Sequence, residues 1–227
     1  MTTTATEATR PGTPATPYGA EDPRLAFAKA VALGTAVIGR VSPQQLVNPT
    51  PCPEYDVRAL LGHLVTVLRR VAALGRGDDP FGPQVAAAVE RDAFQQAWMA
   101  AADDVDDAWA DDSLLQRTVR LPWKEDTGAA IPASYVNEVT VHTWDLATAT
   151  GQRPAWDPQV LSLAFDGIRF MPGQNRAAMF EAMAQRVPAL LRGAQPFADA
   201  VPVSDDAPLI DRLVAWNGRR PEAALPC

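Results

Sequence analysis

Four segments of helical length and periodicity, separated by stretches rich in proline and glycine, constrain the fold of this chain most strongly. They span about residues 24–41, 57–74, 85–111 and 132–150. Asp22 and Asp56 are placed to cap the first two helices, and Pro23 suits a first helical position. Gly75 and Gly151 are predicted to end the second and fourth helices, because glycine readily takes the left-handed conformation found at helix ends. Together the four helices predict an all-α protein built on an antiparallel four-helix bundle.

The remaining segments are shorter. Between the third and fourth helices, a run around Thr118 and Arg120 with a polar turn predicts a short β-hairpin. After Asp157-Pro158, which repeats the cap of the first helix, shorter helical pieces follow, the last of them predicted for residues 206–218. The predicted organisation is a disordered tail over residues 1–21, the bundle over residues 22–152 and a C-terminal helical extension over residues 153–227 that packs on the bundle.

Composition excludes several classes of protein. The net charge is −7, from 20 Lys and Arg against 27 Asp and Glu, and this balance argues against a nucleic-acid binder. No apolar run is long enough to span a bilayer, and the first residues lack the pattern of a secretory signal. Cys52 and Cys227 are too few for a disulfide framework, so we expect a cytoplasmic protein with no membrane partner.

The fourth predicted helix places an acid and an imidazole on one face. Glu138 and His142 are four residues apart, which puts their side chains about 40° apart around the helix. Asp145 follows on the same stripe, and apolar residues flank this stripe on both sides. A carboxylate in an apolar surrounding is costly unless it is paired or binds a metal.

His63 is the other histidine of the chain. It lies in a similar setting on the second predicted helix, with Arg70 two turns further on. If the second and fourth helices face each other, then His63, Glu138 and His142 converge. Two imidazoles and one carboxylate with an open fourth position are the ligand set of catalytic zinc, and also of open iron or nickel sites. The pattern alone leaves three alternatives to a metal site open. Each histidine is then a hydrogen-bonded core residue, or Glu138 and His142 form a pair that only supports the helix. Arg70 is then a surface arginine whose charged group points to solvent.

Three stretches resemble a known family. TPCPEYDVRALLGHLV at residues 50–65 and VNEVTVHTWDLATATGQ at residues 136–152 resemble the two signatures of the mycothiol-dependent maleylpyruvate isomerase N-terminal family. FADAVPVSDDAPLIDRLVAWNGRRP at residues 197–221 is similar to the tail of an uncharacterised metal-binding subgroup. The resemblance implies a DinB-like four-helix bundle. It also implies that His63, Glu138 and His142 bind a divalent metal, usually zinc.

The resemblance further implies an enzyme that uses mycothiol, a small thiol, as co-substrate. A metal-coordinated thiol is deprotonated and can attack a small electrophile, which leads to S-transfer or isomerisation. Tyr55 and Arg70 are candidate thiol-binding residues, and Asp145 is a candidate to orient a ligand imidazole. A hydrolase or lyase that uses metal-bound hydroxide and a non-catalytic metal or ligand binder are the alternatives. The oligomeric state, with a homodimer as one option, is left open.

Overall fold

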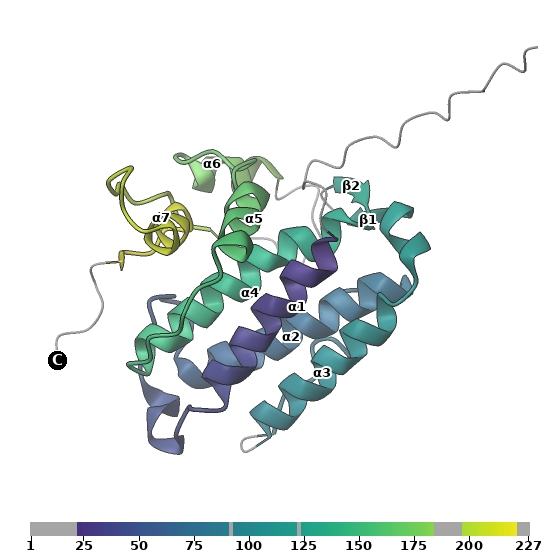
Figure 1. Ribbon diagram of the computed structural model, residues 1–227, viewed down its shortest axis with the longest axis horizontal. Coiled ribbons are helices and arrows are strands. Elements are labelled where there is room, and N and C mark those ends of the chain that lie inside the picture. Colours follow the sequence, from purple (N-terminus) through teal and green to yellow (C-terminus); the bar gives the residue numbers. More distant parts are fainter. Residues whose placement is uncertain (1–21, 91–92, 122–123, 184–196, 222–227) are drawn as a thin grey trace, which may run out of the picture.

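The computed structural model describes residues 22–90, 93–121, 124–183 and 197–221. The disordered tail predicted for residues 1–21 lies outside the described residues. The elements are α1 (Pro23–Ile38), η1 (Pro43–Val47), α2 (Val57–Arg76), α3 (Phe94–Ala108), η2 (Asp112–Gln116), β1 (Thr118–Leu121), β2 (Lys124–Thr127), α4 (Ala130–Ala149), α5 (Pro158–Ile168), α6 (Arg176–Met183) and α7 (Leu209–Trp216). The prediction of a mostly helical protein is confirmed (Figure 1).

Four long helices pack around one apolar core. Helix α2 contacts α3 and α4, while α1 contacts α4 and α3 (Figure 1). The core includes the aliphatic face of α2, where Leu60, Leu64 and Leu68 are wholly buried. Trp98 of α3 is also wholly buried, and its indole Nε1 donates to Thr35 Oγ1 over 2.8 Å, so its polar atom is satisfied within the core.

The short hairpin is confirmed. Strands β1 and β2 are antiparallel, with Thr118 opposite Thr127 and Leu121 opposite Lys124. Val119 and Leu121 are buried, so one face of β1 covers the core while the other faces water. Helix α4 starts three residues after β2 ends, and the hairpin therefore lies at the first turn of the helix that carries Glu138 and His142.

The boundaries predicted from the sequence for α2 and α3 are wrong. Helix α2 passes through Gly75 and ends at Gly77, which has a φ of 81°. Gly75 instead allows α2 to pack closely against the segment after α3, because a Cβ there would lie 2.7 Å from Trp109 Nε1. The third helix spans Phe94–Ala108, not residues 85–111, and Val85 is buried in a turn that bonds back to Gly82. Helix propensity in the alanine-rich stretch is a weak preference that tertiary packing overrides.

The C-terminal helices α5 and α7 contact α4. Helix α5 contacts α4 and α1, and α7 contacts α5 and α4 (Figure 1). Asn217, just after α7, forms a reciprocal amide pair with Asn137 of α4, with N···O distances of 2.9 and 3.2 Å. The last helix spans Leu209–Trp216, so it begins three residues later than predicted, after Pro208. None of the described helices is long and apolar enough to cross a membrane.

Candidate metal centre

Local sequence signals place His63 and the α4 residues face to face. Three prolines keep residues 49–53 out of a helix, and the Asp56 side chain then accepts from Ala59 N over 2.8 Å to start α2. His63 follows two turns into α2. Because α2 packs on α4, His63 lies opposite the stripe that carries Glu138 and His142.

The three predicted ligands converge on one carboxylate oxygen. Glu138 Oε1 lies 3.1 Å from His63 Nε2 and 3.5 Å from His142 Nε2. One donor atom from each of His63, Glu138 and His142 lies within 4.8 Å of the others. The side chains of His63 and Glu138 remain 19% and 24% exposed, so the cluster is open to an approaching small molecule.

Asp145 orients the His142 ring through a hydrogen bond to its Nδ1 atom. Its Oδ2 accepts from His142 Nδ1 over 3.0 Å, which leaves Nε2 directed at Glu138. The Asp145 side chain is wholly buried and also forms an ion pair with Arg219, with N···O distances of 2.8 and 3.2 Å. Arg219 is only 8% exposed and completes the chain Arg219–Asp145–His142, for which no local sequence pattern gave a signal.

Tyr55 lies against His63. The two rings stack with centroids 4.8 Å apart, and Tyr55 Oη lies 3.3 Å from His63 Nδ1. Each imidazole thus has its Nδ1 engaged by an oxygen, from Tyr55 or Asp145, and its Nε2 directed at Glu138. Engagement of the outer nitrogen is what commonly fixes the tautomer of a metal-binding histidine.

Charge complementarity holds this cluster together. Burial alone would raise the pKa of Glu138, yet hydrogen bonds to His142 and His63 hold it well below its usual range. Burial opposes protonation of His142, but hydrogen bonds to Asp145 and Glu138 raise its pKa to about 9. The pKa of Asp145 is lowered because His142 and Arg219 outweigh its burial. Without a metal, the cluster therefore holds a proton on His142 that a cation can replace.

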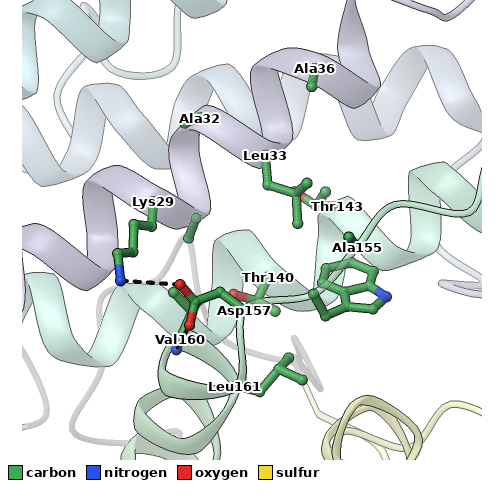
Figure 2. A pocket seen from close by; sticks show the side chains of 12 residues that line it. Lys29, Ala32, Leu33, Ala36, Thr140, Thr143, Ala155, Asp157, Val160 and Leu161 are labelled. Atoms are coloured by element: carbon green, nitrogen blue, oxygen red, sulfur yellow. Dashed lines mark hydrogen bonds and ion pairs between the residues drawn. The ribbon is translucent and has the colours of Figure 1, made fainter.

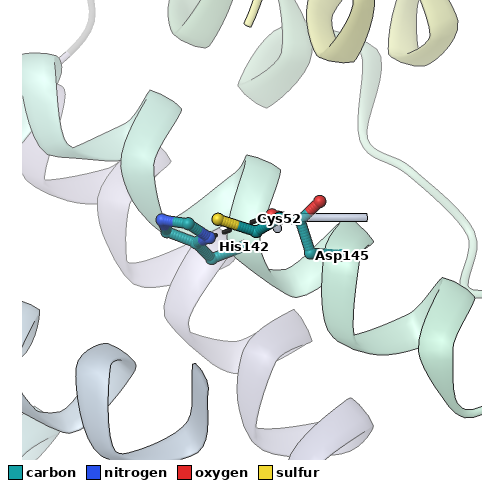
Figure 3. Close-up of side chains that lie close together, drawn as sticks. All are labelled: Cys52, His142 and Asp145. Carbon is teal, nitrogen blue, oxygen red and sulfur yellow. Dashed lines mark hydrogen bonds and ion pairs between the residues drawn. The ribbon is translucent and has the colours of Figure 1, made fainter. Parts of the chain in front are cut away.

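Cys52 is a second neighbour of His142. Its Sγ lies within 4.8 Å of donor atoms of His142 and Asp145, and Figure 3 shows the three side chains together. This trio is a poor alternative metal site, because Asp145 is already paired with Arg219 and His142 Nδ1 is already bonded to Asp145. Burial raises the pKa of Cys52 to about 12, which keeps the thiol protonated. At 3% exposure, Cys52 is a small, buried packing residue.

Arg70 points toward the loop after α2. Its Nε donates to the carbonyl oxygen of Pro80 over 3.4 Å, and its guanidinium lies 5.0 Å from the ring centroid of Phe81. The structure thus brings Tyr55 and Asp145 into direct contact with the histidines and places Arg70 against this loop. Its role as a thiol contact stays a prediction.

Residues 27–147 match the family described as the mycothiol maleylpyruvate isomerase N-terminal domain, and this match covers just over half of the chain. The chain belongs to this family. His63, Glu138, His142 and Asp145 all lie within the matched residues of the mycothiol maleylpyruvate isomerase N-terminal domain, whereas Arg219 lies beyond them.

Relatives also extend over most of the chain. Two uncharacterized proteins, from two strains of Mycobacterium tuberculosis, are each 29% identical over 203 residues. These alignments cover 87% of this chain and 98% of each relative. No solved structure matches the chain.

The cluster fits the divalent metal that the family resemblance implies. Two imidazole nitrogens and a carboxylate oxygen suit zinc and leave room for an exchangeable ligand. The carboxylate and phenol contacts behind the imidazoles add the outer support that metal-binding histidines have. A histidine cluster that only stabilised the core would not need its two Nε2 atoms directed at one partly exposed carboxylate.

Proposed function

We propose that this protein is a zinc-dependent enzyme that uses a small thiol, mycothiol, for S-transfer to or isomerisation of a small electrophile. The convergence of His63, Glu138 and His142 in a member of this family carries the proposal. We further propose that residues 22–152 form a DinB-like four-helix bundle, that residues 153–227 form an extension packed on it, and that the enzyme is cytoplasmic.

A divalent metal held by these three side chains would lower the pKa of a coordinated thiol and so supply a thiolate at neutral pH. The surrounding residues then have separate tasks. Asp145 holds the Nδ1 proton of His142, and Arg219 keeps Asp145 ionised and fixed. Tyr55 covers one face of His63 and, with Arg70 near the loop, is proposed to contact the thiol.

Metal content is the first test. Protein purified without chelators should contain one divalent metal per chain, and His63→Ala and His142→Ala should each lose it. Cys52→Ser is the matched control, because Cys52 lies beside His142 but is not a proposed ligand, and it should retain the metal. Wild-type metal content in both histidine variants would show that the ligand assignment is wrong.

The second test concerns the thiol. Cobalt-substituted protein should gain a sulfur-to-cobalt charge-transfer band in the near ultraviolet when mycothiol is added, with release of a proton. Glu138→Gln should weaken this response, because it removes the negative charge from the ligand set. If saturating mycothiol leaves the cobalt spectrum unchanged while the protein hydrolyses an ester or amide, the hydroxide mechanism replaces the thiol mechanism.

A further inference from the structure

A second polar pair continues the contact between α2 and α4 beyond the proposed metal site. Arg70 follows His63 by seven residues on α2, and Tyr135 precedes His142 by seven residues on α4. At 100° and 1.5 Å per residue, each lies roughly 20° around its helix and about 10 Å along it from the histidine. Because His63 meets Glu138 across the two helices, Arg70 and Tyr135 lie on the faces that meet.

Arg70 and Tyr135 are neighbours. Burial raises the pKa of Tyr135 to about 12, and the adjacent Arg70 guanidinium opposes this rise. The phenol therefore stays protonated at neutral pH and can donate a hydrogen bond. The charge of Arg70 also opposes the rise that burial causes in the pKa of Tyr55, which stacks on His63. Arg70 is thus near Tyr135 and near the tyrosine that contacts a proposed metal ligand.

Arg70 has no acidic partner. In the described part of the chain, no carboxylate oxygen lies within ion-pair distance of its guanidinium. Its Nε makes one long hydrogen bond of 3.4 Å to the carbonyl oxygen of Pro80, and its guanidinium carbon lies 5.0 Å from the ring centroid of Phe81. Arg70 and Tyr135 are both partly exposed, so a ligand can reach them. A partly buried guanidinium without a counter-ion favours an anion with two oxygens, above all a carboxylate.

Two other cations at comparable positions are paired. Arg219, which also lies close to the metal cluster, forms an ion pair with Asp145. Lys29, at the edge of the hollow between α1, α4 and α5, lies 3.1 Å from Asp157 Oδ2 (Figure 2). Arg70 differs from both, because its charge is left for a partner from outside the chain.

We infer that Arg70 and Tyr135 form an anion subsite beside the proposed metal centre, which binds the carboxylate of a molecule held there. The inference rests on the proposed function, because the metal centre holds the rest of that molecule. The guanidinium supplies the charge and a planar pair of donors, and the phenol supplies another donor. The carboxylate can belong to the thiol or to the electrophile, since both present the same group to Arg70.

Two pairs of probes, each a carboxylate and its neutral amide, test the subsite and identify the source. For the thiol, 3-mercaptopropionate and 3-mercaptopropionamide are titrated into cobalt-substituted protein and followed by the sulfur-to-cobalt band. For the electrophile, benzoate and benzamide are titrated calorimetrically into the same protein saturated with 2-mercaptoethanol. Preference for 3-mercaptopropionate over its amide assigns the carboxylate to the thiol, and preference for benzoate alone assigns it to the electrophile. No preference for either carboxylate would overturn the inference.

Substitutions test the two residues. Arg70→Gln should weaken binding of the preferred carboxylate by at least about tenfold and leave the amide unchanged, because hydrogen bonds to a charged group are lost. Tyr135→Phe should weaken carboxylate binding between about threefold and tenfold. Arg69→Gln is the matched control and should bind like the wild type, because Arg69 Nη1 donates to the carbonyl oxygen of Ala87 instead. Equal losses in Arg70→Gln and Arg69→Gln, or no loss in both Arg70→Gln and Tyr135→Phe, would contradict the subsite.

Benzoate binding to chelator-treated protein separates this inference from the proposed function. That titration needs neither a metal nor a thiol, although the Glu138 carboxylate then repels the anion more strongly. A preference for benzoate over benzamide that Arg70→Gln removes would support the subsite even if the chain bound no zinc. If zinc is bound but neither carboxylate is preferred, the subsite is wrong while the metal assignment stands.

Discussion

Arg219 connects the C-terminal extension to the proposed metal site through Asp145. These two side chains are almost completely buried and ion-paired, so removing one leaves the other charge without its partner. Asp145 in turn fixes the ring of His142. At the scale of single residues, the orientation of His142 therefore depends on a side chain that is not itself a proposed ligand.

Replacing Arg219 should weaken metal binding without removing a ligand. We expect Arg219→Gln to lower zinc affinity between about tenfold and a hundredfold, because Asp145 would hold His142 less firmly. Competition with a chromophoric chelator measures this. The matched control is the exposed neighbour, Arg220→Gln, which should bind zinc like the wild type. Equal affinities for both variants would argue against a positioning role for Arg219.

The stability of metal-free protein should depend on the protonation of His142. Its pKa of about 9 in the folded state exceeds the ordinary value of 6.5, so its protonated form stabilises the fold. That contribution is complete below pH 6.5 and is lost as the pH rises through about 9. Urea midpoints of chelator-treated protein should therefore fall between about pH 6.5 and about pH 9. His142→Gln should show a flatter profile, and a decline of the same size in this variant would assign the effect to other groups.

At the scale of elements, close packing of α2 against the end of α3 explains a glycine in mid-helix. A Cβ at Gly75 would lie 2.7 Å from Trp109 Nε1 and 2.8 Å from the carbonyl oxygen of Ala108. Trp109 cannot easily move, because its Nε1 donates to the carbonyl oxygen of Val71 over 2.9 Å and its side chain is buried. The close approach of the two elements thus depends on the missing side chain.

Two glycines of α2 should respond oppositely to alanine. Gly75→Ala should destabilise the protein by about 1–3 kcal/mol, because the new methyl group overlaps Trp109 and the backbone. Gly62→Ala should stabilise it by about 0.5–1 kcal/mol, since the nearest atom to a Cβ there is 4.0 Å away and alanine favours the helix. Free energies of unfolding in urea distinguish the two. Similar effects from both would contradict the packing explanation.

At the scale of the whole molecule, the segment after α7 and helix α4 both contribute to the proposed site. Residues after α7 return to α4 through the Asn137–Asn217 amide pair and the Asp145–Arg219 ion pair. These contacts join positions that are 80 and 74 residues apart in the chain. The predicted extension therefore contributes to the surroundings of His142 and does more than cover the bundle.

Shortening the chain should reveal this contribution. Protein that ends at Pro221 keeps both contacts and should bind zinc with wild-type affinity. Protein that ends at Trp216 lacks Asn217 and Arg219, and its zinc affinity should fall at least as far as that of Arg219→Gln. Chelator competition together with circular dichroism separates lost affinity from lost folding. Wild-type affinity in the shorter, folded chain would confine the site to the bundle.

Local signals in the sequence determined much of this protein. Periodicity and caps located the main helices, because burial of one helix face repeats every three to four residues. The spacing of Glu138 and His142, with His63 and the family signatures, pointed to the cluster that the structure brings together. Only the tertiary structure decided that Arg219 is buried against Asp145 and that Gly75 continues α2. Each of these depends on contacts between elements distant in sequence, for which no local pattern of residues exists.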